Sequence, residues 1–100
     1  MLLLYIQLSY TIEQHPLQQH SITRLFHLAT AFLAQNIGSA DMITNLAEIS
    51  PHLLNTPLHR TAENMISALV NVFEGHSTLT EAEQAIHQEM VSAYMTLHNL

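Results

Sequence analysis

The chain has 100 residues, 48% of them hydrophobic, so it is long enough to form one domain with its own core. It contains no Cys, which excludes disulfides, thiolate zinc sites and thiol nucleophiles. Two Arg and no Lys stand against eight acidic residues, for a net charge of −6, which argues against binding to nucleic acid or to anionic membranes.

The N-terminal segment, residues 4–12, fits two structures. Every second residue is a large apolar one, as in a strand: Leu4, Ile6, Leu8, Tyr10 and Ile12. The spacing of Leu4, Leu8 and Ile12 suits a helix equally well. No other segment has a strand pattern, so a strand here would pair with a second copy of the chain, whereas a helix would join a bundle. Either outcome predicts a homodimer.

Targeting signals are not apparent in this segment. It has no basic residues before its apolar stretch and no small-residue cleavage site. No stretch approaches the roughly 18 apolar residues of a membrane span. We therefore expect a cytoplasmic protein. No internal repeat is visible, so we expect one helical domain over residues 1–100.

The next 40 residues predict two helices. His15-Pro16 predicts a break, because the residue before Pro is pushed out of helical geometry. Ser21 is a suitable N-cap for the first helix, which Gly38 would close. Its apolar face consists of Ile22, Leu25, Phe26, Ala29, Phe32, Leu33 and Ile37. A shorter helix starts at Ser39, and Pro51 either stops it or begins another turn. Its apolar residues are Ile43, Leu46, Ala47 and Ile49.

Residues 56–100 predict two antiparallel helices joined by a short loop. In the first, Thr56 is the expected cap, Pro57 the first residue, and Gly75 the left-handed end. Its apolar residues are Leu58, Ala62, Met65, Ile66, Leu69, Val70 and Phe73. One partner helix cannot cover this face, so the hairpin needs further apolar surface from the first half or from another chain.

The second helix of this pair begins with a capping box. The box is Thr80 with Glu83, or Thr78 with Glu81 two residues earlier. The apolar residues of the helix follow at steps of three and four: Ala82, Ile86, Met90, Ala93, Tyr94, Leu97 and Leu100. We expect these side chains to pack on the preceding helix.

The stretch HLLNTPL, residues 52–58, resembles the phosphoacceptor box of sensor histidine kinases. The box runs His, acidic, aliphatic, basic, Thr or Asn, Pro, Leu, and this chain departs from it at Leu53 and Asn55. The resemblance covers residues 52–100 and implies a dimerising helical hairpin with His52 as phosphoacceptor. Leu53 cannot take the proton that the acidic residue normally accepts. An ordinary helix start at Thr56-Pro57 is therefore the simpler interpretation.

The remaining His residues do not have the spacing of metal ligands. His20 and His27 are seven residues apart, about 10.5 Å along a helix, which is too far for one ion. His87 and His98 are farther apart still. Adjacent pairs such as Ser50 and His52 lack a third catalytic member. We therefore predict no metal, no cofactor and no catalytic residue.

Together these patterns predict an all-α bundle of four to five helices, with a strand at residues 4–12 left open as part of a dimer. The function that we expect is a small acidic protein-binding module that acts through apolar helix faces. An adaptor, a chaperone-like protein or an inhibitor would fit this description, and an enzyme would not. The alternative is a phosphotransfer or dimerisation module that uses His52.

Overall fold

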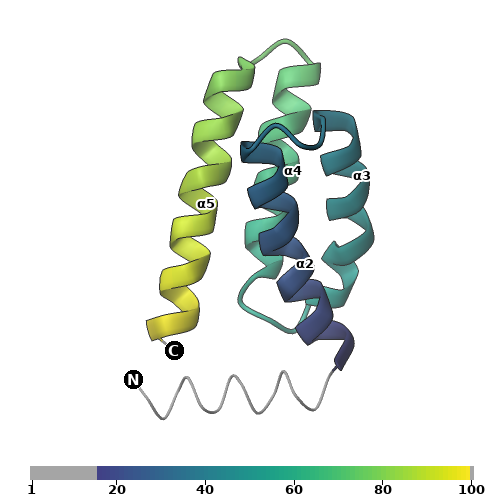
Figure 1. Cartoon of the computed structure of the whole chain (residues 1–100), viewed down its shortest axis with the longest axis vertical. Helices are drawn as coiled ribbons and strands as arrows, with labels where there is room; N and C mark the ends of the chain where they lie inside the picture. Colours follow the sequence, from purple (N-terminus) through teal and green to yellow (C-terminus); the bar gives the residue numbers. More distant parts are fainter. Residues whose placement is uncertain (1–15, 100) are drawn as a thin grey trace.

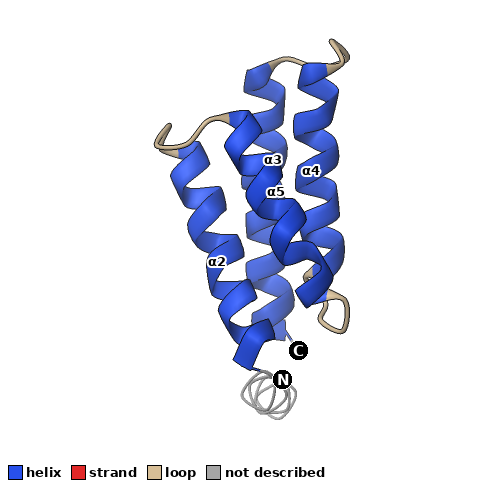
Figure 2. Cartoon of the chain, turned by 90° about the vertical axis from the view of Figure 1, so that its right-hand side faces the viewer, coloured by secondary structure: helices blue, strands red, loops and turns tan. Residues whose placement is uncertain are grey.

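The computed structural model describes residues 16–99 of the chain. They form four α-helices and a 3-10 helix: α2 (Pro16–Leu33), α3 (Ser39–Ile49), η1 (Ser50–Leu53), α4 (His59–Phe73) and α5 (Leu79–Asn99). No strand occurs within residues 16–99, and the all-α prediction is confirmed (Figure 2). Residues 4–12, for which strand and helix were both open, and Leu100 lie outside the described residues.

The helices form a ring in which each one packs against its neighbours. α2 packs against α3, α3 against α4, α4 against α5, and α5 returns to pack against α2. Successive helices run in opposite directions, with the connections 34–38 and 74–78 at one end and 54–58 at the other (Figure 1). This arrangement is an up-down-up-down four-helix bundle, which the short connections favour.

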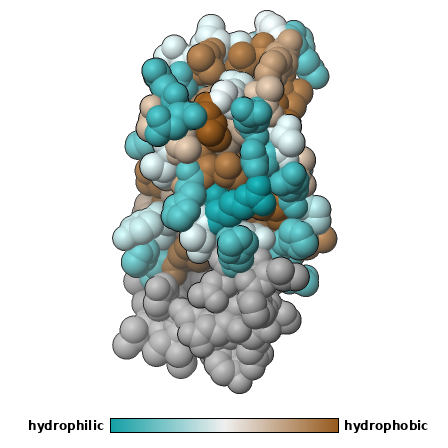
Figure 3. Space-filling view, turned by 45° about the vertical axis from the view of Figure 1, so that its right-hand side comes forward, coloured by the Kyte–Doolittle hydropathy of each residue, from teal (hydrophilic) through white to brown (hydrophobic). Residues whose placement is uncertain are grey.

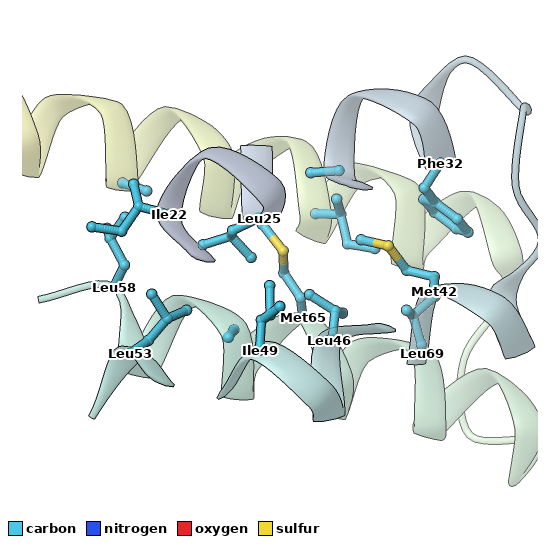
Figure 4. Packing of buried hydrophobic residues seen from close by; sticks show 14 of the residues in the cluster. Ile22, Leu25, Phe32, Met42, Leu46, Ile49, Leu53, Leu58, Met65 and Leu69 are labelled. Atoms are coloured by element: carbon cyan, nitrogen blue, oxygen red, sulfur yellow. The ribbon is translucent and has the colours of Figure 1, made fainter. Parts of the chain in front are cut away.

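The core lies along the axis of this ring and receives side chains from every helix. Its residues are Ile22, Leu25, Ala29, Phe32, Met42, Leu46, Ile49, Leu53, Leu58, Ala62, Met65, Leu69, Ala82, Ile86 and Ala93. Figure 4 shows how those of α2, α3, η1 and α4 meet. Leu46, Leu69 and Ile86 are fully buried, as the apolar spacing predicted. Burial of each such side chain stabilises the fold by about 1.5–3 kcal/mol.

The predicted start of α2 was wrong. The helix begins at Pro16 rather than after Ser21. A Pro at the first position lacks only an N–H that would have no partner there, so the expected break is the start of the helix instead. Ser21 consequently lies inside α2, where it is buried rather than capping.

The predicted end of α2 was wrong as well. The helix ends at Leu33 because Gln35 adopts a left-handed conformation, with φ of 64°. The N–H groups of Gln35 and Asn36 donate to carbonyls of the last helical turn, at 3.0 and 2.8 Å. Ile37 then packs back against the core, and Gly38, with φ of −86°, is the N-cap of α3 rather than the end of α2.

The connection between α4 and α5 has the same geometry as that between α2 and α3. Gly75, with φ of 78°, takes the place of Gln35, and the N–H groups of Gly75 and His76 donate to the last turn of α4, at 3.1 and 2.8 Å. Each connection has five residues, 34–38 and 74–78, and the second follows the first by 40 residues (73 − 33). The structure thus contains two similar helical hairpins that were not visible as a sequence repeat.

Both helices of the second hairpin begin at positions that differ from the favoured prediction. Thr56 lies in a turn, where its hydroxyl donates to the Leu53 carbonyl at 2.8 Å, and α4 starts only at His59. Helix α5 uses the earlier capping box. The Glu81 N–H donates to Thr78 Oγ1 at 3.1 Å, and Thr80 lies inside the helix.

Two large residues that the apolar spacing placed in the core are exposed, and so is Ala47. Phe73 is 62% exposed and Tyr94 is 59% exposed. Phe73 is the last residue of α4, next to the connection to α5. Tyr94 lies on α5, four residues after Met90.

Candidate functional site

Within residues 16–99, a groove runs between α2 and α5. It has a volume of about 480 Å³ and no Asp, Glu, Lys or Arg in its lining, which consists of Thr30, Leu33, Ala34, His87, Met90 and Val91. Tyr94 follows Met90 by four residues and therefore continues the same side of α5. Phe26 precedes Leu33 by seven residues and does so on α2. The groove is thus part of a longer apolar surface.

We call this surface the α2/α5 face. Its apolar side chains are Phe26 and Leu33 of α2 with Met90, Val91, Tyr94 and Leu97 of α5. Val91 and Tyr94 are 42% and 59% exposed, and the other four are partly buried against the core. Large apolar side chains grouped in this way on a surface are typical of an interaction site.

The α2/α5 face exists because α5 carries two adjacent apolar rows. Ala82, Ile86 and Ala93 point into the core and are buried. Met90 and Tyr94 lie beside that row, at the rim where α2 approaches, so α2 covers them only in part. The stripe predicted from the apolar spacing combines the two rows and omits Val91. The sequence does contain a signal for Val91, because this apolar residue stands four positions after His87, on the side of the helix expected to be polar.

A second hollow lies at the end of the bundle that holds the connections 34–38 and 74–78. Its volume is about 370 Å³, and its lining includes Ile37, Leu79 and Glu83. Glu83 of this hollow and His87 of the groove are four residues apart, so the two hollows lie about one helical turn apart on α5. Figure 3 presents another side of the bundle, where apolar atoms also gather near this end and polar atoms cover the middle.

Ser50, His59 and Glu63 form a polar cluster between η1 and α4. The Ser50 hydroxyl donates to Glu63 Oε1 at 2.7 Å, while His59 Nδ1 lies 3.3 Å from the Ser50 carbonyl. A nucleophilic Ser requires its hydroxyl to be held by the His that removes its proton. Here the hydroxyl is held by the carboxylate, and Ser50 is buried. The cluster therefore fixes η1 on α4 and does not form a catalytic triad.

Arg24 connects α2 to α3. Its guanidinium donates to Asn45 Oδ1 and to Glu48 Oε2, the latter at 3.0 Å. The Arg24 side chain is 37% exposed and that of Glu48 is 59% exposed, so the ion pair is screened by water. Arg24 thus binds side chains within the bundle. Arg60, the other Arg of the chain, lies near the start of α4.

His52 lies on η1 and is exposed. The HLLNTPL box covers the end of η1 and the turn that follows, and α4 begins at His59, immediately after the box. The resemblance to histidine kinases implies a His within the first helix of the hairpin, and the structure places His52 before that helix. Leu53 and Leu58 of the box are buried in the core. Core packing and the turn at Thr56 account for these positions.

The other His residues within the described part of the chain lie on three helices and on the connection between α4 and α5. His20 and His27 are exposed on α2, and His87 and His98 are exposed on α5. The ring centroids of Tyr94 and His98 are 4.2 Å apart, so this His contacts the α2/α5 face. Among residues 16–99, no group of three or more His, Cys, Asp or Glu side chains is placed to hold a metal ion.

Comparisons of the chain with protein-family models, with curated proteins and with solved structures find no match. Within the described residues, no helix has the length and apolar character needed to cross a membrane. The geometry of the side chains is therefore the ground for the functional proposal.

Proposed function

We propose that the protein is a small acidic protein-binding module that uses the α2/α5 face to hold an apolar helix of a partner. The observation that carries the proposal is the uncharged groove beside the exposed side chains of Val91 and Tyr94. A groove between two helices accepts the apolar face of a third helix, because side chains of the third helix pack between the two rows.

The composition of the face supports a role in binding rather than in catalysis. Its polar lining consists of Thr30 and His87, which offer few groups to orient a reacting substrate. Met90 has an unbranched, polarisable side chain that adapts to partners of different shape. We propose that the protein acts in the cytoplasm as an adaptor, a chaperone-like protein or an inhibitor, without catalysis.

A charge placed in the face tests this proposal. Val91→Glu would put a carboxylate against the apolar partner, and we expect it to weaken capture of partner proteins from host extract by roughly tenfold or more. The matched control is Met95→Glu, at an apolar residue of α5 that is 55% exposed and lies outside the α2/α5 face. Equal capture by both variants, with helical content unchanged by circular dichroism, would refute a role for the α2/α5 face.

We also propose that the chain forms a homodimer. Leu54 and Phe73, each 62% exposed, leave apolar surface at both ends of the bundle, outside the α2/α5 face. Light scattering at micromolar concentration measures the mass of the particle directly. A mass of one chain would contradict the dimer without bearing on the binding of another protein.

Phosphotransfer through His52 is the second candidate function. It is supported by the exposure of His52 on η1, since a phosphodonor must reach the imidazole. The test is incubation with a phosphorylated response regulator. This candidate requires an acid-labile label that disappears in His52→Gln and persists in His76→Gln, a matched change at another exposed His.

A further inference from the structure

We infer that the partner helix carries an Arg whose side chain enters the second hollow and pairs with Glu83. This hollow lies at the end of the bundle that holds the connections 34–38 and 74–78, and Ile37, Leu79 and Glu83 are part of its lining. The inference rests on the proposed function, because it names the chemistry of the partner helix that the α2/α5 face would hold.

The carboxylate of Glu83 has no partner among residues 16–99. It is the one charged group in the linings of the second hollow, of the groove and of a further shallow hollow on α5 within these residues. Several other carboxylates on the helices accept hydrogen bonds from described side chains, namely those of Glu48, Glu63, Glu81 and Glu89. Glu83 is only partly exposed, so an incoming cation would be less screened there than beside a fully exposed carboxylate.

The polar side chains near Glu83 suit a guanidinium. Gln35, Asn36 and Ser39 line the same hollow, and their side chains make no hydrogen bond with any of the residues 16–99. Their amide and hydroxyl oxygens are acceptors on the same hollow as the carboxylate. An Arg has five N–H donors in a planar group and can donate to several acceptors at once, whereas a Lys presents a single compact ammonium. The hollow therefore favours Arg over Lys.

The apolar lining of the hollow suits the stem of the same side chain. Phe32 is buried, Ile37 is half-buried and packs against the core, and Leu79 is 48% exposed. All three line the hollow, whose volume is about 370 Å³. The methylene groups of an Arg pack on apolar surface while its guanidinium stays among polar groups. One side chain of this kind would thus match both parts of the lining.

The charges at this end of the bundle favour a cation. Helices α3 and α5 both begin here, and the partial positive charge at each start is offset by an acidic residue in the first turn, Asp41 and Glu81 (Figure 1). Neither Arg of the chain is at this hollow. Arg24 is paired with α3, and Arg60 lies near the start of α4, at the opposite end. Glu83 therefore leaves an excess of negative charge at the hollow.

One partner helix is long enough to reach both the groove and the hollow. Glu83 and Val91 are eight residues apart on α5, about 12 Å along its axis, and His87 of the groove lies between them. A partner helix that lies along α5 with an apolar side chain on Val91 would carry the Arg about seven residues from that side chain. A spacing of about seven residues also keeps both side chains on one side of the partner helix.

Synthetic helical peptides test this inference on the full chain. One peptide of about 18 residues carries Leu at steps of three and four, with a single Arg about seven residues, or about 10.5 Å, from the central Leu. A second peptide has citrulline in place of Arg, which removes the charge and keeps a similar shape. Each is made in both sequence directions, because a helix can lie along α5 either way. In fluorescence anisotropy, the Arg peptide should bind about threefold to tenfold more tightly than the citrulline peptide.

Two variants of the protein assign this preference to a residue. Glu83→Gln removes the charge and should bring the ratio of the two affinities to about one. Glu89→Gln removes the same charge from α5 on the side that faces α4, where Glu89 accepts from Asn64 at 3.2 Å, and should leave the ratio as in the parent. A ratio near one in the parent, an unchanged ratio in Glu83→Gln, or an equal loss in both variants would overturn the inference.

The citrulline peptide reports on the proposed function alone. If both peptides bind the parent equally and both weaken in Val91→Glu, the α2/α5 face stands and the Arg site is overturned. An Arg preference that requires Glu83 but survives Val91→Glu would support the Arg site and refute the face as the place of the partner helix. Failure of every peptide to bind the parent would overturn the inference, and capture of partner proteins by Val91→Glu would still test the proposed function.

Discussion

The two hairpin connections allow a matched test of backbone strain. They share one geometry, but the left-handed position is Gly75 in one and Gln35 in the other, with φ of 78° and 64°. Gly adopts this region of φ and ψ without strain, whereas the Cβ of any other residue makes the conformation less favourable. We predict that Gly75→Ala destabilises the protein and that Gln35→Gly stabilises it.

The magnitudes follow from the surroundings of each residue. A Cβ added at Gly75 would meet no heavy atom within 4 Å, so only the backbone conformation contributes. The left-handed region costs a residue with a Cβ about 1–2 kcal/mol, of which the more restricted unfolded chain returns about 0.4–1 kcal/mol. We expect a net loss of about 1 kcal/mol for Gly75→Ala and a gain of about 0.5 kcal/mol for Gln35→Gly.

Thermal unfolding measures both changes. For a domain of this size, 1 kcal/mol corresponds to roughly 4–8 °C in Tm, so Gly75→Ala should lower Tm by about that amount and Gln35→Gly should raise it by about 2–4 °C. Gln35→Ala is the control, because it keeps a Cβ at φ of 64° and should leave Tm within about 2 °C of the parent. A fall in Tm for Gln35→Gly, or equal changes for Gln35→Gly and Gln35→Ala, would refute the explanation.

Three further predictions concern the cap of α5, the core and the phosphoacceptor candidate. Thr78→Ala should lower the free energy of unfolding, measured with denaturant, by about 1 kcal/mol because it removes the N-cap of α5. Thr80→Ala should lower it by less than about 0.5 kcal/mol. The reverse order would indicate that Thr80 and Glu83 form the capping box instead. Leu46→Ala should destabilise by about 2–5 kcal/mol, since Leu46 is fully buried, and a smaller loss would mean that the core closes around the cavity. His52→Gln should leave Tm within about 2 °C of the parent, because His52 is exposed, so any loss of phosphoryl label could not be ascribed to unfolding.

Apolar spacing was sufficient to predict the helical class and much of the core. Leu46, Met65, Leu69 and Ile86 each belong to an apolar pattern with steps of three and four within their own helix, and all four are buried. The spacing is informative because an α-helix repeats every 3.6 residues, so a helix with one buried side must show it in the sequence.

Helix ends were less predictable than helix interiors. Ser21 has the chemistry of a cap, but α2 begins at Pro16 and carries Ser21 into its interior. Gly38 has the chemistry of a left-handed end, but Gln35 takes that conformation and Gly38 caps the next helix. Several neighbouring residues could end α2 by their local chemistry. The position at which it does end allows Ile37 to pack against the core.

The candidate site depended most on the tertiary structure. By itself, the sequence determined that α5 has apolar residues on a helical side, that few charges interrupt them and that no thiol or ammonium chemistry is available. Only the packing of α2 against α5 decided that Ile86 lies in the core while Val91 and Tyr94 stay exposed. The reason is geometric. Periodicity records which side of a helix is apolar, but the width that a neighbour covers depends on where that neighbour lies.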